Sequence, residues 1–190
     1  MRSRSNFRLL AGLLLAGSLI AAVPAAAQTG GAGPPGSTTT TTTTTTTSPS
    51  GTAQMQPDGT AIPPADAPRQ VRKAINAGNR IHTRPYIWGG GHRKFKSTGY
   101  DCSGAVSYVL HAAGLLRSPL SSGPLMAWGS PGVGSWITVY ANKSHAWMTV
   151  AGLRFDTSAV GESFNQGSGP RWRASMRSGT GYAVRFFPGL

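Results

Sequence analysis

The clearest pattern of apolar and polar positions is the alternation in residues 145–150 and 153–156. A period of two is typical of β-strands, and the Ala151-Gly152 pair between the two runs suits a two-residue turn. The sequence therefore predicts an antiparallel hairpin with two different faces. One face carries Ala146, Met148, Val150, Leu153 and Phe155, and the other carries His145, Trp147, Arg154 and Asp156.

Two earlier stretches have apolar residues three and four positions apart, which is typical of amphipathic helices. The first is expected to begin after Asp66, as its N-terminal cap, and to end near Gly78. The second is expected to begin at Cys102 and to end at Gly114. Its apolar face carries Cys102, Ala105, Val106, Val109, Leu110 and Ala113.

Further strands are predicted at residues 136–140 and 182–187 by their aromatic and β-branched content. Helices come first along the chain and strands follow, so we expect an α+β domain with helices packed on a small antiparallel sheet. Residues 65–190 are long enough for one such domain with its own core, and too short for two.

The N-terminal part predicts export. Residues 1–27 have a basic start, an apolar run over residues 9–23 and a small-residue cleavage site, which together are typical of a secretory signal peptide. Residues 28–64 are rich in Gly, Pro and Thr and predict a disordered linker. We expect release into the periplasm or cell-wall space, without a membrane span once the signal is removed. An uncleaved signal that acts as a tether is the alternative.

The chain is strongly basic, with a formal net charge of +13. Three of its 18 Lys and Arg residues lie in the predicted signal, which leaves 15 against five acidic residues. This excess favours anionic surroundings such as cell-wall polymers. The basic residues form no continuous run and accompany no nucleic-acid-binding motif, so we expect no nucleic-acid partner.

Cys102 is the only cysteine. It has no disulfide partner within the chain, and it lies where a glycine-rich segment is expected to become a helix. Free N–H groups and the helix dipole at such a position favour a thiolate, so we interpret Cys102 as a nucleophile. The alternative is a small buried residue that happens to be cysteine.

A cysteine nucleophile needs a base and a group that orients the base. Of the four histidines, His145 is the best candidate, because it begins a core strand and shares a face with Asp156. His92 in the glycine-rich loop is the second choice, whereas His111 is expected to point away from the thiol. His145 as a packed strand residue and His92 as a loop-surface residue are the alternatives.

Asp156 is the predicted orienting residue. With a two-residue turn it lies opposite Trp147 and diagonal to His145, within reach of the imidazole. Asp101 adjoins the thiol, where its charge opposes a thiolate unless it has another partner. The alternative for Asp156 is a surface carboxylate paired with Arg154.

Two motifs and a strand then carry a family resemblance. Residues 85–90 read PYIWGG, residues 100–108 read YDCSGAVSY, and residues 144–148 read SHAWM, in that order. Over essentially the whole domain, the sequence resembles the NlpC-like cell-wall cysteine peptidases. The resemblance implies a reduced papain-like fold, in which a helix with the cysteine packs on an antiparallel sheet with the histidine. It also implies hydrolysis of amide bonds in peptidoglycan stem peptides, often between D-isoglutamate and the diamino acid.

The resemblance also implies a role for each matched residue. Cys102 becomes the nucleophile, His145 the base and Asp156 the third polar residue, where the family more often has His, Asn or Gln. Tyr86 matches a tyrosine near the nucleophile that helps to hold the oxyanion. Two further positions, Asp101 and Ser103, match residues that help to recognise the stem peptide.

The sequence departs from the family around the expected substrate groove. Residues 134–139 replace the usual Pro-Gly-Asp-Leu strand, Ser144 replaces a glycine, and residues 92–96 extend the glycine loop. The exact bond cleaved therefore stays open. The alternatives are a papain-like amidase or acyltransferase on envelope substrates, or an inactive wall-binding protein. The mechanism needs no cofactor or metal, and one cysteine with scattered histidines lacks zinc-ligand spacing.

Overall fold

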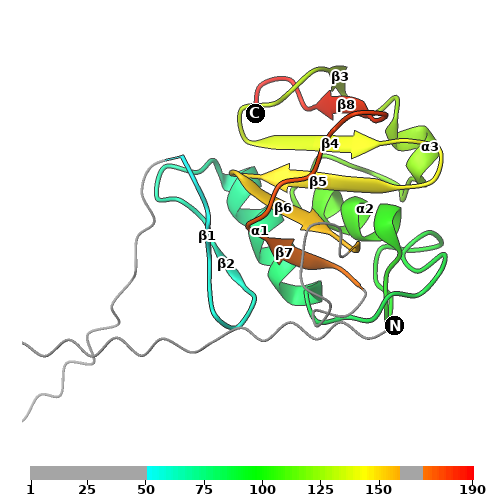
Figure 1. The fold of residues 1–190 in the computed structure, drawn as a ribbon, viewed down its shortest axis with the longest axis horizontal. Coiled ribbons are helices and arrows are strands. Elements are labelled where there is room, and N and C mark those ends of the chain that lie inside the picture. The colour runs from blue at the N-terminus through cyan, green and yellow to red at the C-terminus, as the bar shows by residue number, and fades with distance from the viewer. Residues whose placement is uncertain (1–50, 159–168) are drawn as a thin grey trace, which may run out of the picture. The chain divides into compact units, whose positions relative to one another are not determined.

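The computed structural model describes residues 51–158 and 169–190 (Figure 1). The predicted signal peptide, residues 28–50 of the predicted linker and Glu162 lie outside the described residues. None of the helices in the described ranges is long and apolar enough to cross a membrane.

A six-stranded sheet forms the centre of the described domain. Its spatial order is β3-β8-β4-β5-β6-β7, and every neighbouring pair is antiparallel. The strands are β3 (Ser130–Pro131), β4 (Ile137–Ala141), β5 (Ala146–Val150), β6 (Leu153–Asp156), β7 (Arg171–Arg173) and β8 (Ala183–Phe186). The helices are α1 (Arg69–Ile81), α2 (Cys102–Ala112) and the short α3 (Ser122–Leu125). The predicted α+β class is confirmed.

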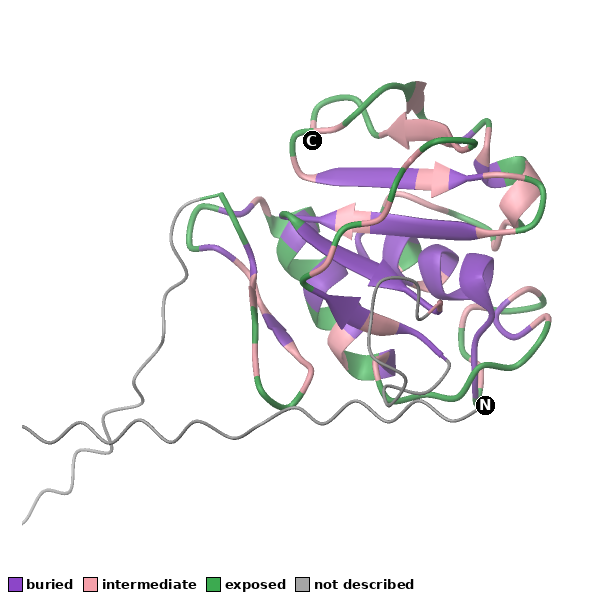
Figure 2. Ribbon diagram, in the orientation of Figure 1, coloured by how far each residue is buried: buried purple, intermediate pink, exposed green. Residues whose placement is uncertain are grey.

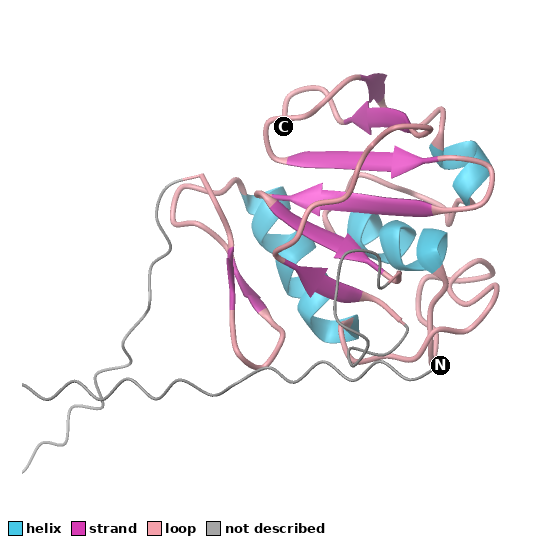
Figure 3. Cartoon of the chain, in the orientation of Figure 1, coloured by secondary structure: helices cyan, strands magenta, loops and turns pink. Residues whose placement is uncertain are grey.

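The core lies where α1 and α2 pack on β5 and its neighbours (Figures 1 and 3). Burial is concentrated in these elements, as Figure 2 shows by the buried residues along α2, β5 and β6. Val109, Leu110, Met148 and Val150 are fully buried. The predicted apolar face of α2 is therefore the face that forms the core, and it carries Cys102 inward.

The predicted hairpin forms with the predicted register. Val150 pairs with Leu153 and Met148 pairs with Phe155, so the turn has two residues. Ala151 and Gly152 both have positive φ, at 45° and 82°, as a hairpin turn of this length requires. This register brings the beginning of β5 and the end of β6 together at the end of the hairpin opposite the turn.

The first helix differs from the prediction at both ends. It begins at Arg69, and Asp66 accepts a hydrogen bond from the Gly51 N–H instead of capping the helix. It also continues past Gly78 to Ile81. The reason is that Gly78 serves close packing: a Cβ at this position would lie 2.3 Å from the Trp172 ring.

The end of the predicted linker is also different. Residues 54–62 contain the strands β1 (Gln54–Met55) and β2 (Ala61–Ile62), which pair as a small hairpin. The Asn79 side chain hydrogen-bonds both the N–H and the C=O of Ala61, at 2.9 Å each. Ordered structure thus begins well before residue 65. Backbone contacts and small alanines hold this hairpin, which explains why it lacks the apolar pattern of a strand.

Candidate active site

Cys102 is the first residue of α2 and is 8% exposed. The carboxylate of Asp101 caps the helix by accepting a hydrogen bond from the Gly104 N–H at 2.7 Å. The glycine-rich segment packs directly against this first turn, because a Cβ at Gly104 would lie only 1.9 Å from the carbonyl oxygen of Gly90. The local sequence thus fixes the thiol at the positive end of a buried helix.

His145 and Asp156 meet across the β5–β6 hairpin. The imidazole Nε2 lies 2.9 Å from Asp156 Oδ1, and the carboxylate side chain is fully buried. Arg154, the alternative partner of Asp156, lies farther away, with its Nε 3.8 Å from Oδ2. The two residues come together because the two-residue turn sets the register that places them diagonally.

The surroundings of His145 favour its charged form. Burial alone would lower its pKa, but hydrogen bonds to the Asp156 and Cys102 side chains, and the charges of both groups, raise the pKa from 6.5 to about 9. Because Nε2 faces Asp156, Nδ1 is the ring nitrogen left for Cys102. Cys102, His145 and Asp156 therefore lie together, and they are the candidates for nucleophile, base and orienting residue.

Asp156 is held as an anion. Burial would raise its pKa, but the hydrogen bond from His145, the hydrogen bond from the Ser158 N–H, the charge of His145 and the hydrogen bond from Arg177 together lower it well below 3.8. The Ser158 hydroxyl also donates to Oδ2 at 2.9 Å. A buried carboxylate with this many donors remains ionised and keeps a fixed orientation.

Arg177 is a site residue that the sequence analysis missed. Its Nη1 donates to Asp156 Oδ2 at 3.0 Å and to the Ser158 hydroxyl at 2.7 Å. Its Nη2 donates to the Tyr182 hydroxyl at 2.9 Å, and its guanidinium lies 5.7 Å from the centre of the Trp147 ring. No local pattern marks Arg177, because it lies in an irregular segment 21 residues from the carboxylate that it binds.

Tyr86 lies near Cys102. Its side chain is partly exposed, and burial, followed by the charges of Cys102 and Asp101, raises its pKa above 10. A bridge between Tyr86 and Tyr100 ties this segment to the residue that precedes the Asp101 cap. The hydroxyl therefore stays protonated at neutral pH and is available as a hydrogen-bond donor.

Asp101 and Ser103 are buried, and they form a cluster with the partly exposed His92. The His92 Nε2 lies 2.9 Å from Asp101 Oδ2 and 2.8 Å from the Ser103 hydroxyl. Asp101 also accepts a hydrogen bond from the Gly89 N–H. His92 is thus a partner of Asp101 and Ser103, and its Nε2 faces these two residues. A role for Asp101 and Ser103 in stem-peptide recognition stays a prediction.

No protein-family model matches the sequence, and no curated protein matches it. Several solved structures match it. One is a hypothetical invasion protein of Mycobacterium tuberculosis, with 24% identity over 62% of this chain and 62% of that chain, at a TM-score of 0.43. The peptidoglycan hydrolase RipB of the same organism has 21% identity over 65% of this chain and 68% of its own, at 0.46.

A third is RipD of Mycobacterium tuberculosis, described as a non-catalytic NlpC/p60 domain protein adapted to peptidoglycan binding. It has 20% identity over 63% of this chain and 98% of its own, at a TM-score of 0.45. The neighbours include NlpC/P60 proteins. This is the family that the two motifs predicted. This chain spans less than two thirds of the first neighbour's length.

Proposed function

We propose that this protein is a secreted cysteine endopeptidase that hydrolyses amide bonds in peptidoglycan stem peptides. The first candidate is the bond between D-isoglutamate and the diamino acid. The observation that carries the proposal is that His145 lies 2.9 Å from Asp156 and close to the Cys102 thiol at the start of α2. We infer that these three residues act as nucleophile, base and orienting carboxylate.

The chemistry follows from this arrangement. The Cys102 thiolate adds to the amide carbonyl carbon, and the negative charge moves to the carbonyl oxygen. The Tyr86 hydroxyl and the Cys102 backbone N–H are the donors placed to hold that oxyanion. The imidazolium of His145 then gives its proton to the amine as the C–N bond breaks, which leaves a thioester. Neutral His145 next takes a proton from water, and the hydroxide displaces the thiolate and releases the acid.

The substrate class rests on the motif resemblance and on charge. Stem peptides carry free carboxylates, and without the predicted signal this chain has 15 basic against five acidic residues. Basic side chains attract such a substrate and raise its local concentration. The departures around the predicted groove leave the choice between neighbouring amide bonds to experiment.

Digestion of purified peptidoglycan tests the proposal. The full-length chain is compared with Cys102→Ala and His145→Ala, with His111→Ala as a matched control because His111 lies on the exposed side of α2. Mass spectrometry of the soluble products identifies the new ends. We expect stem-peptide fragments from the unchanged chain and His111→Ala alone. Products cut between sugar and peptide would favour the amidase, and binding without cleavage would favour the wall-binding protein.

A further inference from the structure

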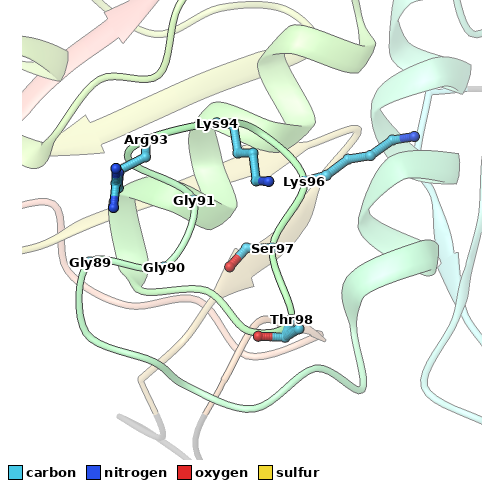
Figure 4. A pocket seen from close by; sticks show the side chains of 8 residues that line it. All are labelled: Gly89, Gly90, Gly91, Arg93, Lys94, Lys96, Ser97 and Thr98. Atoms are coloured by element: carbon cyan, nitrogen blue, oxygen red, sulfur yellow. The ribbon is translucent and has the colours of Figure 1, made fainter.

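The extension of the glycine-rich segment forms a closed loop. Residues 91–98 connect Gly90 to Gly99. These two glycines approach each other so closely that a Cβ on Gly90 would lie 2.4 Å from the Gly99 carbonyl oxygen. This loop surrounds a cavity of about 450 Å³ (Figure 4). Neither Cys102 nor His145 lines this cavity.

Contacts to the domain hold the loop in place. Phe95 stacks on His111 with ring centres 3.7 Å apart and nearly parallel planes. At one end of the loop, His92 is fixed by Asp101 at 2.9 Å, and at the other the Ser97 N–H donates to the Tyr100 hydroxyl. These contacts therefore hold the loop backbone in one conformation, which lowers the entropy cost of binding a ligand.

The side chains that it presents are basic. Arg93, Lys94 and Lys96 line the cavity, together with the hydroxyls of Ser97 and Thr98. Figure 4 shows Arg93 and Lys94 on the loop around the cavity, whereas Lys96 extends toward α1. Lys96 and Ser97 also line a second cavity of about 270 Å³.

The second cavity adds Arg80 and Arg84, so five cations in total line the two adjoining cavities, and Lys96 lines both. All five are exposed, and none of their side chains forms a hydrogen bond or an ion pair within residues 51–158 and 169–190.

The described acidic residues are engaged elsewhere. Asp58 hydrogen-bonds Thr60, Asp66 hydrogen-bonds the Gly51 N–H, Asp101 caps α2 and Asp156 hydrogen-bonds His145. Five like charges around two adjoining cavities repel one another. A ligand with several anionic groups would relieve this repulsion.

We propose that this surface binds the phosphate groups of a phosphodiester-linked polymer of the cell envelope and thereby holds the protein in the wall. Arginine and lysine are the usual ligands of phosphate, and two adjoining cavities suit a chain of anions better than a single one. Of the two aromatic residues in the described lining, Tyr100 is 2% exposed and Tyr108 is partly buried, so neither offers a fully exposed ring on which a nucleic-acid base could stack.

A lipid surface also carries phosphate groups, and it is the main competitor. Trp88, next to Gly89 in the chain, is 87% exposed, and an aromatic beside basic residues is a feature of membrane-surface anchors. The cations, however, line cavities rather than one apolar face. Anionic vesicles are therefore included in the test as a separate probe.

The experiment measures binding of poly(glycerol phosphate) by isothermal titration calorimetry. The full-length chain carries Cys102→Ala, so the result does not depend on cleavage. In the test variant Arg93, Lys94 and Lys96 are all changed to Gln. A matched control variant changes three exposed basic residues that line neither cavity to Gln, namely Lys73, Arg117 and Lys143.

We expect the loop variant to weaken binding by at least about tenfold and the control variant by less than about threefold, with a smaller salt dependence in the loop variant. Equal losses in both variants would overturn the proposal, because net charge alone would then explain the binding. Tighter binding to phosphatidylglycerol vesicles, or to an oligonucleotide of equal phosphate content, would also overturn it.

Discussion

The imidazole of His145 and the carboxylate of Asp156 lie 2.9 Å apart, at the end of the β5–β6 hairpin farthest from its turn. The turn, which is separated from Asp156 by three strand residues and from His145 by five, decides whether these side chains meet. A one-residue change of register would move Asp156 to the opposite face of the sheet. The electrostatics of the site are thus set by the geometry of an ordinary hairpin.

The charge of Asp156 is predicted to control the pH dependence of activity. Asn keeps a hydrogen-bond acceptor at this position but removes the negative charge that stabilises the imidazolium. In Asp156→Asn we expect the alkaline fall of kcat/KM to move from near pH 9 toward the ordinary histidine pKa, with a moderate loss of rate. Asp156→Ala should lower kcat/KM by at least about 100-fold. Identical pH profiles for Asp156→Asn and the unchanged chain would show that the charge of Asp156 does not control the pH dependence.

Arg177 is predicted to position Asp156 and to oppose the protonation of His145. Removing its positive charge should raise the pKa of His145 further, since less of the carboxylate charge is neutralised. In Arg177→Met we expect a lower kcat and an alkaline limb displaced to higher pH. Arg177→Lys should return the alkaline limb of the pH profile to its original position but restore only part of kcat. The reason is that Lys lacks the two guanidinium nitrogens that reach Asp156, Ser158 and Tyr182. A uniform loss at every pH would indicate a structural role alone.

Tyr86 is predicted to act only in the transition state. Tyr86→Phe removes a hydroxyl donor near Cys102 while the ring stays in place. We expect kcat to fall by about 100-fold with little change in KM. Tyr140→Phe is the control, since Tyr140 stacks on Trp147 with ring centres 3.8 Å apart and a phenylalanine ring preserves that contact. A rise in KM at constant kcat would instead assign Tyr86 to substrate binding.

Gly104 is predicted to be essential for the position of the nucleophile. A Cβ here would collide with the Gly90 backbone, so Gly104→Ala must displace the start of α2 or the loop that packs on it. We expect a loss of about 1–3 kcal/mol in the free energy of unfolding and a large loss of activity. The matched control is Gly123→Ala in α3, where a Cβ meets nothing within 4 Å. Denaturant unfolding compares the two, and equal stability would contradict the packing argument.

The hairpin and α2 could be predicted from the sequence because their signals are local. Alternation of apolar residues and a two-residue turn fix the pairing of Met148 with Phe155. The change at Cys102 from a glycine-rich segment to apolar residues three and four positions apart likewise marks a helix start. His145 and Asp156 followed from these two elements, without knowledge of the rest of the fold.

Other features depend on contacts between distant residues, and the sequence does not show them. The β1–β2 hairpin is fixed by Asn79, 18 residues from Ala61. Gly78 has the residue type of a helix end, yet it makes room for Trp172 across the domain. The link from Arg177 to Asp156, and the role of His92 as a partner of Asp101, depend on the same kind of long-range packing.

The most direct test of the central claim is the rate of alkylation of Cys102 by iodoacetamide as a function of pH. One added group per chain reports on this residue alone, because the chain has a single cysteine. The account predicts that at pH 6 the unchanged chain reacts at least about tenfold faster than His145→Ala, since the imidazolium stabilises the reactive thiolate. His111→Ala should react like the unchanged chain. Equal rates for the unchanged chain and His145→Ala would contradict the thiolate–imidazolium pair and, with it, the proposed peptidase mechanism.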